Sequence, residues 1–310
     1  MKNTPASLSI PSSRQSPREP SLQPSPARLT APPVSSMSRL ESGLLLALAL
    51  AWVVACFGPA LAQPAHYHVF ADQRDGWGVP YAMDVLSNLP FAVAGVWGLV
   101  ALQRMPPDAV PAATPDMAPD SGQNSHRPLA ALFFAGLTVT SACSGYYHWA
   151  PHNAGLAIDR LGMVVAFAGL LGLAVADRIS ARAGMATAIA VLLLGPLSVA
   201  VWATSGNLLP WAVLQGGGML LVLLLALFRP ICKPIPNAWG IPLGAVIAIY
   251  ALAKALELAD HQVFELTHGL VSGHSLKHVV AALAAWPVIG VMHNHATHHR
   301  QRQGNVTVAR

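Results

Sequence analysis

The sequence has very little charge. Asp, Glu, Lys and Arg make up only 10% of its 310 residues, whereas roughly 25% is usual in soluble domains. A soluble protein needs charged side chains on its surface, so this composition excludes an ordinary soluble enzyme, and it also excludes a disordered or coiled-coil protein. The formal net charge is +5, but the basic residues are scattered, and we therefore expect no binding to nucleic acid. The three cysteines are far apart, which predicts no disulfide.

Hydrophobic residues, in contrast, make up 54% of the chain. They are concentrated in segments of about 20 residues, the length that a helix needs to cross ~30 Å of hydrocarbon. The connecting loops are mostly short, which favours antiparallel neighbours. We therefore expect an all-α integral membrane protein. Its core, residues 63–293, would be a bundle of seven transmembrane helices at approximately 85–103, 128–148, 158–176, 183–203, 208–228, 239–258 and 275–293.

Two segments precede this core. Residues 1–40 are rich in Ser and Pro, which predicts a disordered leader. Residues 41–62 are apolar and fit either an N-terminal membrane anchor or a secretory signal peptide, because Arg39 supplies a charged start and Ala60-Leu61-Ala62 resembles a cleavage site. Translation from Met37 would give a signal peptide of ordinary length. The sequence does not decide between these two alternatives.

The distribution of Lys and Arg predicts the orientation of the bundle. Either alternative for residues 41–62 leaves residue 63 outside. The segments that would then lie inside hold fourteen of the Lys and Arg residues, against four on the outer side. The positive-inside rule therefore supports a core bundle whose N-terminus is outside and whose C-terminus is cytoplasmic. Residues 294–310 would form an inner polar tail.

Thirteen histidines stand out in so apolar a chain, because ionisable groups inside a membrane are costly and usually functional. The expected topology places His148, His274 and His278 at similar depth in the outer leaflet. His274 and His278 are four residues apart, which lets two imidazoles on one helix bind one metal ion, and His148 on a facing helix would complete a three-histidine site. Three protein ligands and an open position are typical of catalytic zinc. A single histidine here would fit an amphipathic anchor, but the three together predict a metal site.

Two further polar residues fall at the same depth. Ser144 lies one turn before His148 on the same helix face, and Asp159 opens the next helix. Asp159 could relay a proton or orient a ligand histidine, and Ser144 could donate a hydrogen bond to a developing oxyanion. Ser144 also fits a small residue at an ordinary helix contact.

The histidines suggest a rival site as well, a di-iron oxygenase centre. Its three histidine boxes would be His148/His152, His274/His278 and His295/His298/His299. The expected topology disfavours this interpretation. His278 and His295 are 17 residues apart, or ~26 Å along a helix, which puts the third box on the inner side of the membrane. Pro151 also disfavours a continuous helix through the first box.

Three segments carry a resemblance to a known family: FADQRDGWGVPYAMDVLSNLPF (70–91), SACSGYYHWAPHNAGLAIDRLGM (141–163) and GHSLKHVVAALAAW (273–286). Across roughly 66–293, the chain resembles the alkaline ceramidase family. That family belongs to a superfamily of seven-helix membrane hydrolases that also contains adiponectin-type receptors. The motifs concerned are Ser144-x-x-x-His148, Asp159 eleven residues later, and His274-x-x-x-His278.

The resemblance implies a zinc-dependent membrane amidase that hydrolyses ceramide-like lipid amides to a sphingoid base and a fatty acid. His148, His274 and His278 would bind Zn2+, and Ser144 and Asp159 would be the catalytic residues. The substrate would be a membrane lipid that reaches the site from the outer leaflet. Another lipid hydrolase of the same superfamily and a non-enzymatic seven-helix receptor remain alternatives. The oligomeric state is not indicated.

The segment around Asp72, Asp75 and Asp84 departs from the family pattern. Eukaryotic members carry an acidic, Trp-containing segment that binds calcium near the zinc ion. Here Trp77 is present, but the acidic residues have a different spacing and Arg74 stands among them. The sequence therefore leaves a Ca2+ site open. Ser87 and Asn88 also resemble a family feature, and we interpret them as a polar pair in helix packing.

Overall fold

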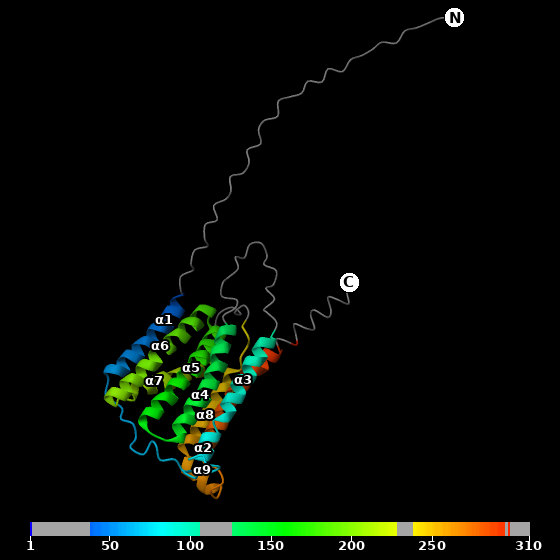
Figure 1. Ribbon diagram of the computed structural model, residues 1–310. Helices are drawn as coiled ribbons and strands as arrows, with labels where there is room; N and C mark the ends of the chain where they lie inside the picture. The colour runs from blue at the N-terminus through cyan, green and yellow to red at the C-terminus, as the bar shows by residue number, and fades with distance from the viewer. Residues whose placement is uncertain (2–37, 106–125, 228–237, 295–296, 298–310) are drawn as a thin grey trace. The chain divides into compact units, whose positions relative to one another are not determined.

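The computed structural model describes residues 1, 38–105, 126–227, 238–294 and 297. Apart from Met1, these residues belong to one unit of the chain, Ser36–Arg310. In the ranges described, the protein is all-helical and has no β-strand (Figure 1). The prediction of an all-α protein is therefore confirmed. The expected leader at 1–40 and the expected tail at 294–310 lie almost entirely outside the described residues.

Six helical segments in the described ranges are long and apolar enough to cross a membrane. Helices α2 (Ala82–Leu86) and α3 (Leu89–Arg104) together form one of them. The others are α4 (His126–Trp149), α5 (Asn153–Arg178), α6 (Ala181–Ser205), α7 (Leu209–Leu227) and the segment Gly273–Asn294, which contains α10 (Gly273–Ala282) and the 3-10 turn η1 (Leu283–Ala285). These helices support the prediction of a multi-pass membrane protein. That the bundle has seven spans stays a prediction.

The remaining expected span, 239–258, forms a shorter helix than its apolar composition indicates. Helix α8 (Leu243–Leu258) begins only at Leu243, after Gly240 in a left-handed conformation with φ of +73° and Pro242 at the N-cap. Its 16 residues extend ~24 Å, less than the ~30 Å of a hydrocarbon core. The short helix α9 (Asp260–Leu266) follows directly, because Ala259 is both the C-cap of α8 and the N-cap of α9.

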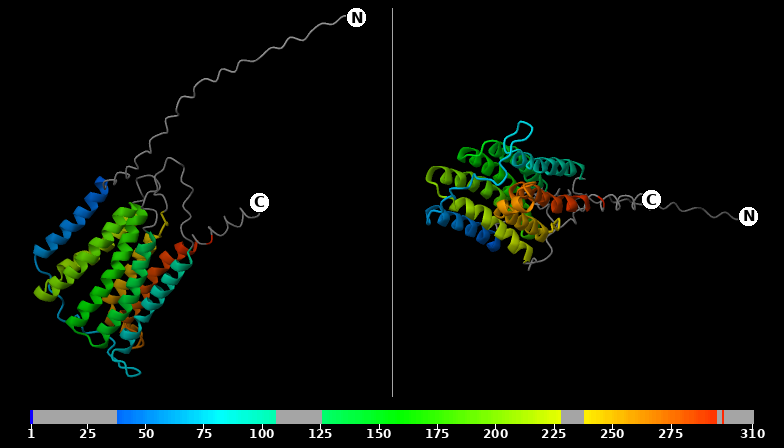
Figure 2. Two further views of the ribbon diagram at one scale, coloured as in Figure 1. Left: turned by 45° about the horizontal axis from the view of Figure 1, so that its top comes forward. Right: turned by 90° about the horizontal axis from the view of Figure 1, so that it is seen from below.

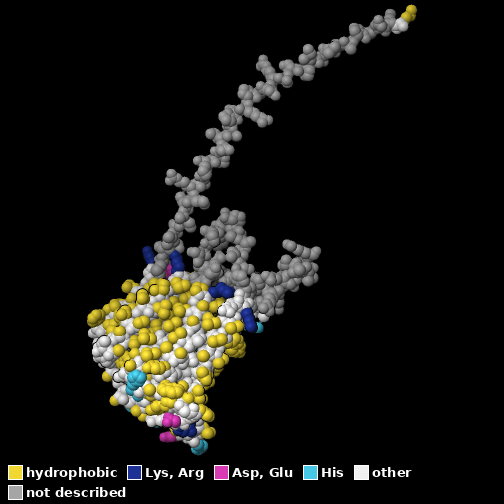
Figure 3. All heavy atoms as spheres, in the orientation of Figure 1, with side chains coloured by type: hydrophobic (Ala, Val, Ile, Leu, Met, Phe, Trp, Pro, Cys, Tyr) yellow, Lys and Arg dark blue, Asp and Glu magenta, His cyan; other side chains and the backbone are white. Residues whose placement is uncertain are grey.

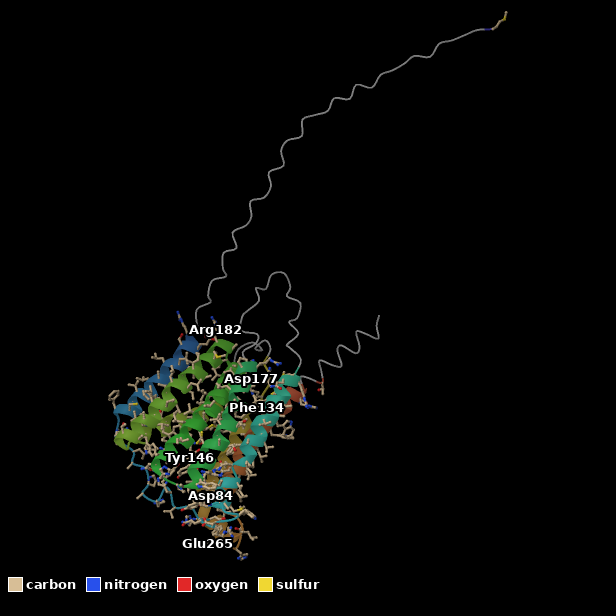
Figure 4. All side chains as sticks on the ribbon, in the orientation of Figure 1. Asp84, Phe134, Tyr146, Asp177, Arg182 and Glu265 are labelled. Carbon is tan, nitrogen blue, oxygen red and sulfur yellow. The ribbon has the colours of Figure 1, made fainter. Side chains whose placement is uncertain are left out.

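On one face of the bundle, charged side chains gather at the two ends (Figure 3). Figure 3 shows a face covered by hydrophobic side chains, with Lys, Arg, Asp and Glu gathered at its two ends. Figure 4 places Arg182 and Asp177 toward one end and Asp84 and Glu265 toward the other, with Phe134 between them. This distribution suits a protein whose middle contacts lipid, because charge in the hydrocarbon core is costly.

Helices α4 and α5 pack closely because glycine lines both sides of their contact. A Cβ atom at Gly136 would lie 2.3 Å from the backbone nitrogen of Ala166, and a Cβ atom at Gly169 would lie 2.2 Å from the backbone nitrogen of Phe133. No larger residue fits at either position without moving a helix. Small residues are typical of helix contacts in membranes, where they let backbones approach. These contacts join the first half of α4 to the middle and second half of α5, and Gly162, where a Cβ atom would lie 2.8 Å from the Cβ atom of Cys143, continues the close approach toward the end of α4.

The buried carboxylate of Asp177, at the end of α5, ties the segment before α8 to the bundle. It accepts hydrogen bonds from the backbone nitrogens of Gly240 and Ile241, each at 2.9 Å, and it pairs with Arg178. Arg178 in turn donates to the carbonyl oxygen of Ile241 at 2.7 Å. The irregular backbone before α8 therefore has partners for its polar groups, which a membrane protein requires at such positions.

Residues 41–62 form most of helix α1 (Arg39–Phe57) and the segment after it, and both parts contact the bundle. Helix α1 packs against α6 and α7, as Figure 2 also shows. The Trp52 indole donates to the Ser198 hydroxyl at 2.7 Å. Beyond the helix, Asn207 donates to the carbonyl oxygen of Ala55 at 3.4 Å and accepts from the backbone nitrogen of Leu61 at 3.1 Å.

These contacts favour the anchor alternative for residues 41–62. When the full-length sequence is expressed, we expect the purified protein to retain α1. Removal of α1 would leave the polar groups of Ser198 and Asn207 without these partners. The measurement is the intact mass of the protein after expression in a host that processes signal peptides. A mature chain that starts at Gln63 would show instead that the segment is a cleaved signal peptide.

Candidate metal centre

Three histidines from two helices meet at one end of the bundle. His148 lies in the last turn of α4, and His274 and His278 lie in the first two turns of α10. Their candidate ligand nitrogens all lie within 4.8 Å of one another, and the Nε2 atoms of His148 and His274 are 3.3 Å apart. All three residues are buried. The structure thus brings together the three histidines predicted as ligands, and we call them the histidine triad.

Ser87 orients one of these imidazoles. Its hydroxyl donates to the carbonyl oxygen of Asp84 at 3.1 Å, and its oxygen lies 2.8 Å from Nδ1 of His278. With the hydroxyl proton of Ser87 directed to Asp84, the hydrogen bond to His278 takes its proton from Nδ1. The lone pair of His278 is then on Nε2. Metal-ligating histidines ordinarily have such a partner on the other nitrogen, so Ser87 does more than pack two helices.

The N-terminus of α10 is seated tightly against α8 and α9. Asp260 accepts a hydrogen bond from the backbone nitrogen of His274 at 2.7 Å, and its second oxygen accepts from the backbone nitrogen of Ala71 at 2.9 Å. A Cβ atom at Gly273 would lie 2.2 Å from the carbonyl oxygen of Leu256, so only glycine allows this approach. The position of His274 is therefore set by backbone contacts.

The fully buried Asp84 connects the triad helix to α2. Its Oδ1 atom accepts a hydrogen bond from the Ser275 hydroxyl at 2.7 Å and lies 3.5 Å from the Ser272 hydroxyl. The Ser272 hydroxyl also accepts from the backbone nitrogen of Ser275, which caps α10. The acidic side chain therefore supports the start of α10 through the side chains of Ser272 and Ser275.

An aromatic ring covers the triad. The Phe70 ring is buried, and its centroid lies 4.8 Å from that of His148 and 4.4 Å from that of His274. The segment that carries Phe70 is held by His68, whose two ring nitrogens lie 2.8 Å from the Tyr147 hydroxyl and 2.8 Å from the Asn153 side-chain oxygen. Phe70 thus limits the access of water to the histidines.

Ser144 and Asp159 face each other across the α4–α5 contact. Both are buried, and the Ser144 hydroxyl interacts with the Asp159 carboxyl group. The Oδ1 atom of Asp159 accepts no hydrogen bond from the described part of the chain. Ser144 also lies one turn before His148 on α4. The structure therefore pairs the two residues predicted to be catalytic and leaves one carboxyl oxygen of Asp159 available.

An apolar cavity of about 130 Å³ lies farther along the bundle. Aliphatic and aromatic side chains from α3, α4, α5, α7, α8 and the last span make up most of its lining. Phe91 lines the cavity and also contacts His278, with ring centroids 6.2 Å apart. The cavity and the triad are therefore neighbours.

The acidic residues considered for calcium do not gather into a site. Asp72 is bound by the neighbouring Arg74, which donates to it from Nε at 2.8 Å, from Nη2 at 2.7 Å and from its backbone nitrogen at 3.1 Å. Burial raises the pKa of Asp72, but these hydrogen bonds and the charge of Arg74 outweigh burial and lower the pKa overall. Asp75 is exposed. The histidine triad is the one group of three or more potential His, Cys, Asp or Glu ligands in the ranges described.

The rival histidine boxes are not brought together by the described residues. His152 is exposed at the N-cap of α5, where its ring contacts the carbonyl oxygen of Ala150, and it does not belong to the triad. His295, His298 and His299 lie outside the described residues.

Spacing and depth in the sequence do not reveal four of the residues around the triad: Phe70, Asp84, Ser87 and Asp260. The sequence does contain a signal for Asp84 and Asp260, because a carboxylate beside an apolar segment needs a polar partner. The signal for Ser87 is the helix break at Asn88 and Pro90, which separates α2 from α3. Phe70 carries no distinguishing signal.

We also compared the chain with known proteins. No protein-family model and no curated protein sequence matches it. Its function must therefore be inferred from the geometry of the histidine triad and its surroundings.

Proposed function

We propose that the protein is a zinc-dependent membrane amidase that hydrolyses ceramide-like lipid amides to a sphingoid base and a fatty acid. The observation that carries the proposal is the convergence of three buried histidines, with a Ser–Asp pair one turn before His148 and an apolar cavity whose lining residue Phe91 contacts His278. The apolar lining of the cavity suits hydrocarbon, although its volume holds only part of an acyl chain, and the resemblance to the alkaline ceramidase family points to a lipid amide.

The residues present fit a zinc ion. Three imidazoles, one of them held by Ser87 in the tautomer that leaves Nε2 free, form a typical catalytic donor set for zinc, in which a fourth position stays open. Neutral imidazole is a good ligand for a borderline metal such as Zn2+. When bound, Zn2+ would supply a Lewis acid that polarises the amide carbonyl and lowers the pKa of water.

The side chains then have distinct tasks in the hydrolysis. Water adds its oxygen to the amide carbonyl carbon while the unpartnered Oδ1 of Asp159 accepts a proton from it. As negative charge develops on the carbonyl oxygen, the Ser144 hydroxyl turns its single proton from Asp159 to that oxygen. Asp159 returns the proton to the amide nitrogen as the C–N bond breaks. The products are a fatty acid and a free amine, and Phe70 keeps other water out.

We further propose that the triad faces the outer side of the membrane. Four helix ends opposite the triad carry arginine: α3 ends at Arg104, α4 begins with His126-Arg127, α5 ends at Arg178 and α6 begins with Ala181-Arg182. The positive-inside rule assigns that end to the cytoplasm. Lipid would then reach the triad from the outer leaflet.

The first test is the removal of one ligand. His278→Ala should abolish zinc binding, because it removes the imidazole that Ser87 orients and leaves only two of the three ligands. The measurement is the zinc content of the purified protein by elemental analysis. His152→Ala, which removes an exposed histidine outside the triad, is the matched control and should keep its zinc. Full zinc occupancy in His278→Ala would contradict the assigned site.

A second test addresses the orientation of His278. Ser87→Ala should weaken zinc binding by about 10- to 100-fold, the usual effect of losing a hydrogen bond to a ligand histidine. Ser141→Ala is the control, because the Ser141 hydroxyl donates only to the carbonyl oxygen of Asn88, at 2.8 Å, and no hydrogen bond joins it to a histidine. Chelator competition gives both affinities. Equal losses in the two variants would mean that Ser87 has only a packing role.

The third test concerns turnover. Asp159→Asn removes the proton acceptor but keeps the size of the side chain, so we expect kcat to fall by about 10²- to 10⁴-fold with zinc content unchanged. Mass spectrometry of fatty acid released from ceramide and from a panel of lipid esters and amides provides the measurement. Full turnover by the variant would exclude the role of Asp159. A zinc-loaded wild type that cleaves no lipid of the panel would favour the receptor alternative.

A further inference from the structure

The segment that follows α1 is fixed at two points by hydrogen bonds of its backbone. At the first, the carbonyl oxygen of Leu61 accepts from the backbone nitrogen of Leu208 at 2.7 Å. At the second, the backbone nitrogen of Ala71 donates to the carboxylate of Asp260 at 2.9 Å. We call residues 63–70, which lie between these two points, the strap.

Between its fixed ends, the strap is held to the helices by side chains. Its backbone–backbone hydrogen bonds in the described part of the chain only close its own turns, from Tyr67 to Pro64 at 3.1 Å and from Val69 to His66 at 2.9 Å. Every strap residue except Phe70 is at least partly exposed. The strap can therefore move away from the bundle without breaking a backbone ladder.

Phe70 is the part of the strap that touches the histidine triad. Its ring is 4% exposed, and its centroid lies 4.8 Å from that of His148 and 4.4 Å from that of His274. A movement of the strap would carry this ring with it and would open two of the three imidazoles to water.

A buried arginine of α5 holds the middle of the strap. Arg160 is 2% exposed, and its Nη2 atom donates to Oε1 of Gln63 at 3.0 Å. Its Nε and Nη1 atoms have no hydrogen-bond partner among the described residues. Asp159 attracts it through space, but Arg160 forms no ion pair with any residue that the structure describes.

Aromatic rings take the place of the missing partners. The guanidinium carbon of Arg160 lies 4.0 Å from the ring centroid of Trp202 on α6, 5.6 Å from that of Tyr67 and 5.7 Å from that of Trp211 on α7. All three distances are within the range of cation–π attraction. Arg160 therefore joins two residues of the strap, Gln63 and Tyr67, to three helices of the bundle.

Helix packing alone does not account for a cation at this position. A buried arginine with a single hydrogen bond is costly, and an apolar side chain would pack against Trp202 and Trp211 without that cost. Only a donor can bind Gln63, however. Gln63 is half-buried, so water can replace Arg160 as its partner, and the connection is one that can open and close.

The strap also has room to move. An open cleft of about 1130 Å³ runs beside it, and the lining of this cleft includes Gln63 and His68 of the strap together with Trp202. Strap side chains that leave Arg160 can therefore turn into an open space instead of displacing a helix.

We propose that the strap is a lid over the histidine triad and that Arg160 is the positioning residue that holds it closed. When the strap is closed, Phe70 separates the imidazoles from water. When water replaces Arg160 at Gln63, the strap turns toward the cleft, and water, metal ions and the polar ends of products can pass. This inference rests on the metal site of the proposed function and does not depend on which lipid is cleaved.

The test is the rate at which zinc enters and leaves the purified full-length protein. A lid lies in the path in both directions, so its loss raises both rates equally and leaves the equilibrium affinity unchanged. We expect Arg160→Met to raise the loading rate and the rate of zinc loss to a soluble chelator by about tenfold each, the effect of losing one hydrogen bond to a charged group. Arg160→Lys keeps the charge and a donor and should restore slow exchange at least in part.

Two further variants separate a lid from a simple packing role. Arg104→Met removes an exposed arginine at the other end of the bundle and should exchange zinc like the wild type. Gln63→Leu lies in the strap, carries the test if Arg160→Met fails to fold, and should also speed exchange about tenfold. Unchanged rates in both Arg160→Met and Gln63→Leu, or a loss of zinc affinity without faster loading, would overturn the inference.

A wild type that binds no zinc would instead contradict the proposed function, and chemical labelling then decides the inference on its own. The probe is diethyl pyrocarbonate, a water-soluble reagent that modifies neutral imidazole, and mass spectrometry measures its rate of reaction with each histidine of the metal-free full-length protein. His274 should react about tenfold faster in Gln63→Leu than in the wild type, whereas the exposed His152 should react equally in both. Equal rates at His274 would reject the strap as a lid.

Discussion

The geometry of the histidine triad depends on the way the N-terminus of α10 is fixed. Asp260 binds the backbone nitrogen of His274 and also that of Ala71, so one buried carboxylate joins α9, α10 and the segment that carries Phe70. Gly273 allows this approach because it has no side chain. A shift of α10 by even one residue would rotate both of its histidines away from His148, since each residue turns a helix by about 100°.

The hydrogen bonds of the polar residues around the triad reflect the requirement that buried polar groups be paired. Asp84 holds the hydroxyl of Ser275, and its carbonyl oxygen accepts the proton of Ser87. That second bond leaves Ser87 able to act only as an acceptor toward His278. The tautomer of a candidate metal ligand is therefore determined by a backbone carbonyl in another helix. Stability and metal binding cannot be separated at this point of the fold.

The sequence predicts the triad well because helix periodicity and topology are both strong signals. The four-residue spacing of His274 and His278 places them on one face, and the antiparallel order of spans brings His148 to the same end. The length of α8 was less predictable, because apolar composition continues through Trp239 and Ile241 while Gly240 and Pro242 delay the helix. The contact of Trp52 with Ser198 is a tertiary feature, and hydropathy cannot distinguish a packed helix from a cleaved signal peptide.

The division of tasks among the helices bears on how specificity arises. Helices α4 and α10 carry the histidines, and they are constrained by the close glycine contacts at Gly136 and Gly273. Helix α8 carries no ligand of the triad, yet it lines the apolar cavity, and its Glu257 pairs with Lys277 of α10 at 2.8 Å. A substitution of a cavity-lining residue of α8, away from the contact of Leu256 with Gly273, can therefore change the surroundings of a substrate without moving a metal ligand. If the proposed function holds, α8 is the element on which substrate choice can vary while the reaction stays the same.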